Sequence, residues 1–398
     1  MGEFTMTEQL SKRFPSVPVA LITYSTRPRG GVAHTLALGE AMYALGQDVL
    51  IVGLGNPEAG FFRSVAAPTK VVQLPTVDGG LEEKVDANID AMAAALNEIA
   101  QDYPVLHTQD CISARAAARV RDAGAAVAVV RTVHHVDDFD TEKLMDCQRK
   151  AITEPDVVFV VSESWRQNMS DEYDVKAYLV SNGVNVQRYR DASPALAKEL
   201  RARIGASELP LILAVGGIEP RKGTDNLVRA LSRLKRDSSS APVLAVLGGH
   251  SFQDHRWYRD KVLAELDELD LVLGTDIVEL GSVPEHEMGA WYAAADVLAF
   301  PSVKEGFGLA ALESMAAGTP VVTSDLPVFR EWIHDEALLV ELGDVTGLAE
   351  ALNDAIRNQV LREQLIVKGQ ALAQRFSWES SALEHLELYA RTTQLING

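Results

Sequence analysis

Short apolar runs alternate with stretches of helical periodicity along the whole chain. In the first half these runs predict β-strands at Val17–Tyr24, Asp48–Leu54, Lys70–Leu74, Pro104–Thr108, Ala126–His134, Asp156–Val161 and Ala177–Val180. Between them, apolar residues recur at helical spacing in Ala33–Gly46, Leu81–Gln101 and Ile112–Gly124. Strands that alternate with helices are typical of an α/β fold, in which helices cover both faces of a parallel sheet.

The second half repeats this pattern. Its predicted strands are Leu211–Val215, Val243–Leu247, Ile277–Leu280, Val297–Phe300, Pro320–Thr323 and Leu338–Val340. Its predicted helices are Thr224–Leu234, His255–Leu269, His286–Ala294, Leu309–Ala317 and Thr346–Phe376. The sequence therefore predicts two doubly wound Rossmann-like domains, residues 6–190 and 191–376, facing across a cleft at the carboxyl ends of both sheets. Residues 1–5 precede a second methionine and are interpreted as a cloning remnant.

The composition limits the expected partners and compartment. The chain has 398 residues and a formal net charge of −19, from 37 Lys and Arg against 56 Asp and Glu. Such an acidic surface repels phosphate backbones and anionic headgroups, so we expect no nucleic-acid partner. Cys111 and Cys147 are the only cysteines and fit a reducing cytoplasm. No apolar run approaches the roughly 20 residues of a membrane-spanning helix, so no integral membrane segment is expected.

The first candidate phosphate loop is Arg29-Gly30-Gly31-Val32, between a predicted strand and a predicted helix. Glycines there let backbone N–H groups approach a phosphate, and a helix N-terminus adds positive potential. A plain strand-to-helix turn with unusual dihedral angles explains these glycines equally well. The full dinucleotide fingerprint G-x-G-x-x-G is absent, which weakens the interpretation as a nicotinamide-dependent dehydrogenase.

The strongest signal is a glycine loop and helix that carry two glutamates. The segment reads Lys304-Glu305-Gly306-Phe307-Gly308-Leu309-Ala310-Ala311-Leu312-Glu313. Helical neighbours of Glu313 three and four residues away are apolar, so its carboxylate needs hydrogen-bond donors, which the hydroxyl groups of a ligand could supply. Glu305 lies in the preceding loop, at the carboxyl end of a strand, where ligands bind. The alternative is a buried structural glutamate and an ordinary loop glutamate.

Two further polar segments are candidates. Glu219-Pro220-Arg221-Lys222-Gly223 places adjacent cations before a helix, which suits an anionic ligand, although a solvated charged turn is the alternative. Arg131–Asp138 contains His134, His135, Asp137 and Asp138, which with Asp140 could suggest a metal site. Because no matching set of spaced ligands occurs elsewhere, we interpret this segment as a strand end that presents a polar residue into a cleft, and we assign no metal ligand.

Together these segments resemble the family 4 retaining glycosyltransferases of the GT-B fold, over nearly the whole chain. The matching segments are Gly30-Gly31, Thr132-Val133-His134, Asn182-Gly183-Val184, Arg221-Lys222-Gly223 and Glu305 through Glu313. The last is similar to the paired-glutamate motif of the family, with seven residues between the two acids. The tail around Ser377-Trp378-Glu379 is similar to the closing helix that returns to the first domain. Residues 377–398 are therefore expected to complete the domain of residues 6–190, on the acceptor side.

The resemblance implies a role for each matching residue. His134 and Glu305 would lie near the donor sugar, Lys222 would hold the diphosphate, and these three are the expected catalytic residues. Glu313 would bind the ribose hydroxyls. The other expected donor-binding residues are Gly30, Gly31, Arg221, Gly306, Phe307, Gly308, Leu309 and Ala310. One position departs from the family, because Gly217 stands where an arginine is usual, and Arg221 is the nearest candidate replacement.

The resemblance also implies the reaction. A retaining, hexosyltransferase-type enzyme in the cytoplasm would use a nucleoside diphosphate sugar as co-substrate, a UDP-sugar being expected before a GDP-sugar, with a small-molecule or glycan acceptor. It would need no metal or other cofactor, because fixed cations and N–H dipoles can stabilise the leaving diphosphate. A nucleotide-sugar epimerase, a sugar phosphorylase and a non-catalytic nucleotide-sugar-binding protein are the alternatives. The combination of His134, Lys222, Glu305 and Glu313 favours an enzyme.

Overall fold

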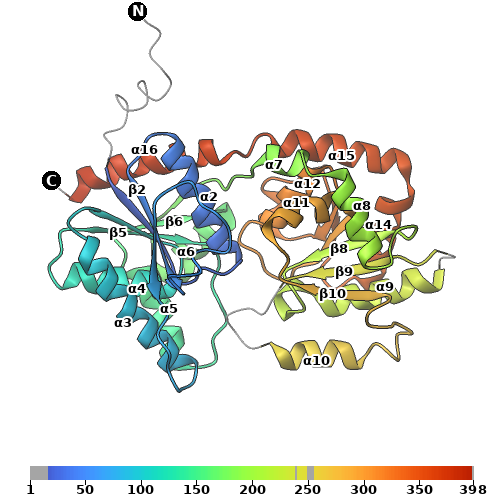
Figure 1. Cartoon of the computed structure of the whole chain (residues 1–398), viewed down its shortest axis with the longest axis horizontal. Coiled ribbons are helices and arrows are strands. Elements are labelled where there is room, and N and C mark those ends of the chain that lie inside the picture. The colour runs from blue at the N-terminus through green and yellow to red at the C-terminus, as the bar shows by residue number, and fades with distance from the viewer. Residues whose placement is uncertain (1–16, 238–239, 249–254, 397–398) are drawn as a thin grey trace, which may run out of the picture. The chain divides into compact units, whose positions relative to one another are not determined.

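The computed structural model describes residues 17–237, 240–248 and 255–396, which divide into two compact units (Figure 1). The first unit contains the chain up to Gly183 and the helix that begins at Trp378. The second unit runs from Val184 to Ser377. Residues 1–5, interpreted above as a cloning remnant, lie outside the described residues.

The first unit is built on a seven-stranded parallel sheet in the order β3-β2-β1-β4-β5-β6-β7. All five residues of β1 are buried, as the apolar run predicts for a central strand with both faces covered. The order reverses between β1 and β4, and β1 pairs with β2 on one side and with β4 on the other, in both cases from Val19 onwards. The strands are β1 (Val19–Thr23), β2 (Val49–Gly55), β3 (Thr69–Gln73), β4 (Val105–Thr108), β5 (Ala128–Val133), β6 (Val157–Val160) and β7 (Ala177–Leu179).

Helices cover both faces of this sheet (Figure 1). Leu36 of α2 (Gly30–Ala44) and Leu386 of α16 (Trp378–Ile396) join Leu21 of β1 in one apolar core. On the other face, Ile152 of α5 packs with Val158 of β6. The remaining helices of the unit are α3 (Leu81–Ile99), α4 (Cys111–Asp122), α5 (Glu142–Thr153) and α6 (Glu163–Tyr173).

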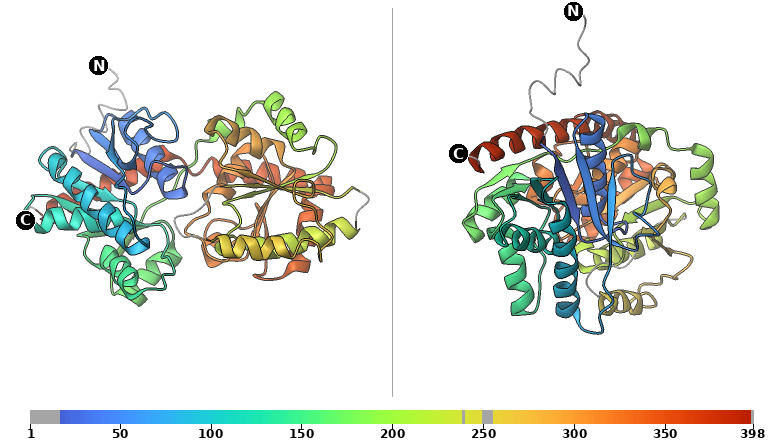
Figure 2. Two further views of the ribbon diagram at one scale, coloured as in Figure 1. Left: turned by 60° about the horizontal axis from the view of Figure 1, so that its bottom comes forward. Right: turned by 60° about the vertical axis from the view of Figure 1, so that its left-hand side comes forward.

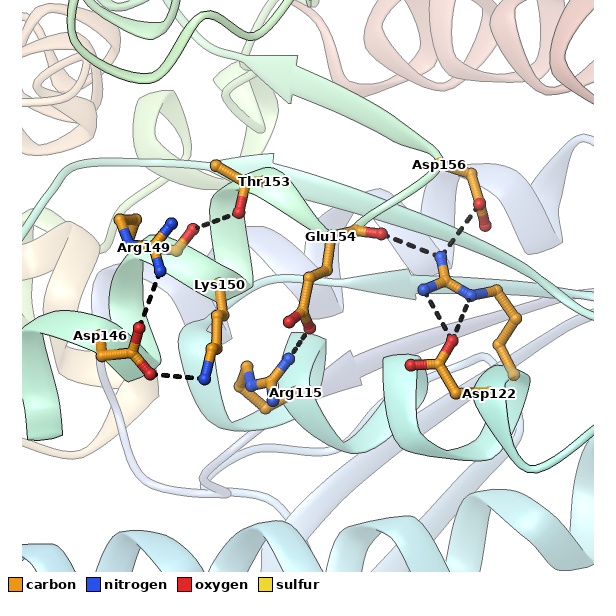
Figure 3. Close-up of polar contacts among 9 residues, drawn as sticks. Arg115, Asp122, Asp146, Arg149, Lys150, Thr153, Glu154 and Asp156 are labelled. Carbon is orange, nitrogen blue, oxygen red and sulfur yellow. Dashed lines mark hydrogen bonds and ion pairs between the residues drawn. The ribbon is translucent and has the colours of Figure 1, made fainter.

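Polar contacts fasten α4, α5 and the start of β6 to one another (Figure 3). Arg121 of α4 donates to the carbonyl oxygen of Glu154 at 2.9 Å, just beyond the last residue of α5, and pairs with Asp156 at 3.0 Å. Asp156 also accepts a hydrogen bond from the backbone N–H of Val129 at 2.7 Å. Arg115 pairs with Glu154 from the preceding turns of α4. These contacts set the position of α4, whose N-terminus lies at the carboxyl edge of the sheet.

The second unit contains a six-stranded parallel sheet in the order β10-β9-β8-β11-β12-β13. Its strands are β8 (Leu211–Val215), β9 (Val243–Leu247), β10 (Ile277–Gly281), β11 (Val297–Phe300), β12 (Val321–Ser324) and β13 (Leu338–Val340). Every strand of both sheets coincides, within a few residues at each end, with one of the predicted apolar runs. For the strands that are buried throughout, such as β1, β9 and β11, this agreement follows from burial, because strands covered on both faces cannot alternate with polar residues.

Helices also cover both faces of the second sheet (Figure 2). Leu231 of α9, Val262 of α10 and Leu352 of α14 share a core with one face of the strands. The other face is covered by α11 and α12 (Figure 1). The helices are α7 (Val186–Arg190), α8 (Pro194–Arg203), the short 3-10 helix η1 (Pro220–Lys222), α9 (Thr224–Asp237), α10 (Arg256–Ala264), α11 (Glu285–Ala294), α12 (Leu309–Ala317), α13 (Pro327–Arg330), α14 (Val345–Arg357) and α15 (Gln359–Ala373).

Three features differ from the expectation. The helix expected over His255–Leu269 is α10, which ends at Ala264. The single helix expected over Thr346–Phe376 is two helices, because Asn358 leaves the helical conformation at φ −84° and ψ 94° and its side chain accepts from the N–H of Leu361 to cap α15. The chain passes into the second unit after Gly183, rather than at residue 190, because Tyr189 of α7 packs its ring against Tyr292 of α11. Among the described residues, no helix combines the length and apolar character that crossing a membrane requires.

Candidate active site

In the second sheet the strand order reverses between β8 and β11, and charged groups follow both strands. The cations Arg221 and Lys222 lie in η1, in the segment that follows β8. Glu305 lies in the loop between β11 and α12. Ligands of open α/β sheets bind beyond the carboxyl ends of the strands at such a reversal. The fold therefore brings two of the segments identified from the sequence to the expected edge of one sheet.

One oxygen of Glu305 receives both cations. Lys222 Nζ donates to Glu305 Oε1 at 2.7 Å, and Arg221 Nη1 donates to the same oxygen at 2.9 Å. Arg221 Nη1 also donates to the carbonyl oxygen of Lys304 at 3.2 Å. Arg221 therefore lies beside Lys222 in this group, with about a third of its side chain, 33%, exposed.

Burial and charge act in opposite directions on this group. Burial by itself raises the pKa of Glu305, but the charges of Lys222 and Arg221 outweigh it and lower the pKa to about 2. Burial lowers the pKa of Lys222, and Glu305 partly opposes that shift. Two cations against one carboxylate leave a net positive charge beside a helix N-terminus, which is the electrostatic setting of an anion site.

Glycines allow this close packing. Gly216 has φ +124°, and a Cβ there would come within 2.4 Å of Lys222 Cε, so the lysine stem lies against the glycine backbone. Gly223 has φ +63°, and a Cβ there would come within 2.1 Å of the carbonyl oxygen of Pro301. The ammonium of Lys222 lies 4.5 Å from the ring centroid of Phe300, at a distance that permits a cation–π interaction. The Lys222 head group is therefore fixed before any ligand binds.

Helix α12 begins directly after the Glu305 loop. Its N-cap is Gly308 with φ +95°, and no described side chain caps the helix. A Cβ on Gly308 would come within 2.4 Å of the Phe329 ring, so both the backbone and the packing require glycine here. The N–H groups of Leu309 and Ala310 belong to the first helical turn, where backbone donors have no acceptor within the helix. Phe307 anchors the loop by stacking on Trp332 at 5.1 Å between ring centroids.

Glu313 lies about one turn further along α12, and the protein itself supplies a hydrogen-bond donor for its carboxylate. Tyr292 of α11 donates to Glu313 Oε2 at 2.8 Å. Burial raises the pKa of Glu313, and hydrogen bonding by Tyr189 and Tyr292 opposes the shift. The expectation that this carboxylate needs donors is met, although tyrosines rather than a ligand meet part of it.

Gly30 and Gly31 form the first turn of α2, at the carboxyl end of β1 in the first unit. Neither has a positive φ, so the interpretation as a turn with unusual dihedral angles does not account for them. A Cβ on Gly30 would meet nothing within 4 Å, and one on Gly31 would meet only His134 Cδ2, at 3.9 Å. Backbone geometry and packing within the first unit therefore do not require glycine at either position.

His134 follows β5 in the same unit. Its Nε2 lies 2.9 Å from Oε1 of the buried Gln109, which follows β4. Its ring lies edge-on to His34 of α2, with 4.6 Å between ring centroids. Burial lowers the pKa of His134 well below its ordinary value, so the imidazole is neutral at pH 7. Its neighbour His135 pairs with Asp137 at 3.3 Å, and no three His, Cys, Asp or Glu side chains in the described part of the chain are arranged to hold a metal ion.

Two family models match this chain, one in each half. The model of Glycosyltransferase Family 4 matches residues 28–188, and that of Glycosyl transferases group 1 matches residues 197–372. The chain belongs to the group 1 and family 4 glycosyltransferases. It is an enzyme that transfers sugar.

Relatives and solved structures agree with this assignment. The glycosyltransferase is 25% identical to D-inositol 3-phosphate glycosyltransferase of Corynebacterium aurimucosum, over 94% of this chain and 95% of that one. It is 28% identical to phosphatidyl-myo-inositol mannosyltransferase of Mycobacterium leprae, over 92% and 94%. Sucrose-phosphate synthase from Thermosynechococcus elongatus has the same fold, with a TM-score of 0.77 at 23% identity over 95% and 100% of the chains. The fold is thus the two-domain, Rossmann-like GT-B fold.

The predicted site residues of this glycosyltransferase form one group in each unit. In the first unit Gly31, the neighbour of Gly30 in the chain, lies beside His134. In the second unit Glu305 contacts Arg221 and Lys222, and α12 carries Leu309, Ala310 and Glu313.

The sequence analysis missed the residues that hold these groups. Gln109 could have been found as a polar residue at a strand end, by the same reasoning that identified His134. Tyr189 and Tyr292 carried no signal, because only the packing of α7, α11 and α12 brings them to Glu313.

Proposed function

We propose that this glycosyltransferase is a retaining, metal-independent enzyme that binds the diphosphate of a nucleoside diphosphate sugar at Lys222, Arg221 and the first turn of α12. One observation supports this proposal most directly. Two cations held by Glu305 and the N-terminus of α12, which has no side-chain cap, lie where the strand order of the second sheet reverses between β8 and β11. Anions bind at helix N-termini because several N–H groups and the helix dipole act on them together.

The same groups account for catalysis. Breaking the bond between the sugar and the diphosphate places negative charge on the leaving oxygen, and preorganised donors aimed at that oxygen lower the barrier. Lys222 and the N–H groups of Leu309 and Ala310 supply such donors without the need for a divalent metal. In the retaining reaction, the acceptor oxygen attacks on the face that the diphosphate leaves, and its proton passes to the departing diphosphate. Glu305 holds both cations in position until the diphosphate binds between them and α12.

The first unit supplies the other contacts in this proposal. The open space beside Gly30 and Gly31 suits close approach of a ligand to the backbone. The neutral ring of His134 then bonds a hydroxyl of the donor sugar without adding charge. Acceptor hydroxyls belong to the same region, at the carboxyl edge of the first sheet.

For the donor we propose a UDP-sugar before a GDP-sugar. For the acceptor, the printed names of the relatives direct the first tests to inositol phosphates and phosphatidylinositol. At 25% and 28% identity these names select candidates for testing, and other small polyols and glycans belong in the same screen.

A thermal-shift screen against UDP-, GDP-, ADP- and TDP-sugars tests the donor site. A ligand at 100 times its dissociation constant adds about 2.7 kcal/mol to stability, so one nucleotide should raise the melting temperature clearly. The best donor is then incubated with each acceptor, with and without EDTA. Transfer that survives EDTA, with the anomeric configuration retained, is expected. Conversion of the donor sugar without any acceptor would identify an epimerase instead, and loss of transfer in EDTA that Mg²⁺ or Mn²⁺ restores would overturn metal independence.

A further inference from the structure

Two buried tyrosines lie at the carboxylate of Glu313. Tyr292, which is fully buried in α11, donates its hydroxyl to Glu313 Oε2 at 2.8 Å. Tyr189 of α7 is buried beside it, with 5.7 Å between the two ring centroids and an angle of 75° between the ring planes. Tyr189 also hydrogen-bonds the Glu313 carboxyl group, so this group has aromatic donors from two other helices.

The tyrosines are held in place by their own contacts. The guanidinium of Arg188 lies 5.4 Å from the ring centroid of Tyr189. Arg188 Nη2 also donates to the carbonyl oxygen of Glu285 at 3.0 Å and pairs with its carboxylate. At the other end of α11, Thr319 donates to the carbonyl oxygen of Tyr292 at 2.7 Å. The ring of Tyr189 and the backbone of Tyr292 are thus each held by a further contact.

This arrangement determines what Glu313 can offer to a ligand. A carboxylate has about four acceptor positions, of which Tyr292 occupies one on Oε2 and Tyr189 another, so about two remain for two adjacent hydroxyls. Burial raises the pKa of Glu313, whereas hydrogen bonding by both tyrosines and the charge of Arg188 oppose the rise. The tyrosines therefore favour the ionised form, which only accepts hydrogen bonds, and they limit its rotation.

We propose that Tyr292, supported by Tyr189, is a positioning residue that fixes the carboxyl group of Glu313 toward the 2′- and 3′-hydroxyls of the donor ribose. This inference rests on the proposed function, a nucleoside diphosphate sugar as donor, and on the ribose-binding role that the family resemblance implies for Glu313. A site built to bond ligand hydroxyls discriminates strongly against an analogue that lacks them. Tyr292 consequently contributes to the preference for a ribonucleotide without touching the nucleotide.

The test compares the better bound of UDP and GDP with its 2′,3′-dideoxy form, by calorimetry, in wild-type protein, Glu313→Gln and Tyr292→Phe. Phenylalanine keeps the ring packing and removes only the hydroxyl. We expect Tyr292→Phe to weaken ribonucleotide binding by about tenfold, the effect of losing a hydrogen bond to a charged group. Binding of the dideoxy form should change less than about twofold, because that form does not use Glu313.

Tyr258→Phe is the matched control. Tyr258 is also buried in the second unit, and its hydroxyl donates to a carboxylate, Asp225 Oδ1, at the same distance of 2.8 Å. This variant should alter neither nucleotide. A second readout is pH: loss of the Tyr292 hydroxyl raises the pKa of Glu313, so ribonucleotide affinity should begin to fall at a higher pH on acidification than in wild-type protein.

The outcomes separate the two proposals. Equal binding of both nucleotides by wild-type protein, or an unchanged preference in Glu313→Gln, would overturn the ribose role of Glu313. If Glu313→Gln loses the preference but Tyr292→Phe keeps it, or weakens both nucleotides equally with no change in the pH profile, the positioning role of Tyr292 alone is overturned.

Discussion

The glycine at position 217 affects the roles that we expect for Lys222 and Arg221. Gly217, which stands where the family usually has an arginine, has φ +79°, a left-handed conformation that disfavours any side chain. Arg221 contacts the same Glu305 oxygen as Lys222, so a second cation is present from another position in the loop. Lys222 is the more buried of the two, with 14% of its side chain exposed against 33% for Arg221.

From this difference we predict unequal losses of turnover. Lys222→Ala should lower kcat by about 10²–10³, the usual cost of removing one preorganised donor at a developing oxyanion. Arg221→Ala should lose roughly tenfold, because water screens a partly exposed cation. Steady-state kinetics with the donor identified in the screen, on variants with wild-type melting temperatures, checks this. Equal and large losses in both variants would show that Arg221 replaces the arginine that is usual at position 217. Near-normal turnover in Lys222→Ala would contradict the assignment of Lys222 to the diphosphate.

At the scale of elements, two helices begin with glycines that serve different purposes. In α12, Gly308 is required by its positive φ and by the Phe329 ring. In α2, Gly30 and Gly31 have ordinary dihedral angles and open surroundings. Glycine is a poor helix former, and nothing within the first unit requires it in the first turn of α2. We therefore expect that a bound ligand needs the space beside these glycines.

Alanine substitutions should separate these two cases. Gly31→Ala should leave stability unchanged or raise it by up to about 1 kcal/mol, because alanine is the better helix former. Its kcat should nevertheless fall by roughly tenfold to a hundredfold, as expected when a ligand is displaced by about an ångström. Gly308→Ala should instead lower stability by about 2 kcal/mol or more, through the left-handed backbone and the ring contact. Urea unfolding and turnover measured on both variants make the comparison, and full activity in Gly31→Ala would argue against a ligand at α2.

At the scale of the whole molecule, the C-terminal helix completes the first unit through buried histidines. His107 of β4 bonds the hydroxyl of Tyr389 at 2.5 Å and Thr132 at 2.7 Å. His385 of α16 bonds the carbonyl oxygen of Ser381 at 2.7 Å, and Ser381 donates to the carbonyl oxygen of Ser181. Burial lowers the pKa of His34 to about 3 and that of His385 to about 4. The first unit is thus held together by histidines that must remain neutral.

These shifts predict a pH dependence of stability. A histidine whose pKa is lowered by folding binds its proton only in the unfolded chain, so stability is fully present above about pH 6.5 and is lost as the pH falls toward the folded value. Each such histidine contributes a slope approaching about 1.4 kcal/mol per pH unit. Hydrogen-exchange protection of β4 and α16 should therefore fall steeply between about pH 6 and 5. His385→Asn keeps a donor for Ser381 but binds no proton. The slope of unfolding free energy against pH should therefore be shallower by up to about 1.4 kcal/mol per pH unit, the contribution of one proton.

The exposed His334 provides the control, because the same change to asparagine there should leave the slope as it is. A slope that is equally steep in His385→Asn and in wild-type protein would show that other groups govern the loss of stability in acid.

The sequence by itself determined the strands and both sheets, and it placed the candidate site residues after particular strands. Apolar runs flanked by glycine and proline locate strands in any α/β protein, because burial on both faces leaves no choice of residue type. Glu305, Lys222 and His134 were identified as candidates because each follows a strand end, where ligands of such folds bind, and their roles stay predictions. Helix boundaries were less predictable, since a local cap such as Asn358 divides a continuous pattern.

Only the tertiary structure decided which groups meet. That Arg221 and Lys222 share one oxygen of Glu305 depends on residues 83 and 84 positions apart in the chain. The tyrosine donor to Glu313 and the glutamine partner of His134 come from other elements, 21 and 25 residues away. No local pattern encodes such pairs, because hydrogen bonds between distant side chains arise from packing that the periodicity of one element does not describe. The sequence therefore located the chemistry along the chain, and the packing of helices and loops at the carboxyl edge of each sheet set the partners and charge of each group.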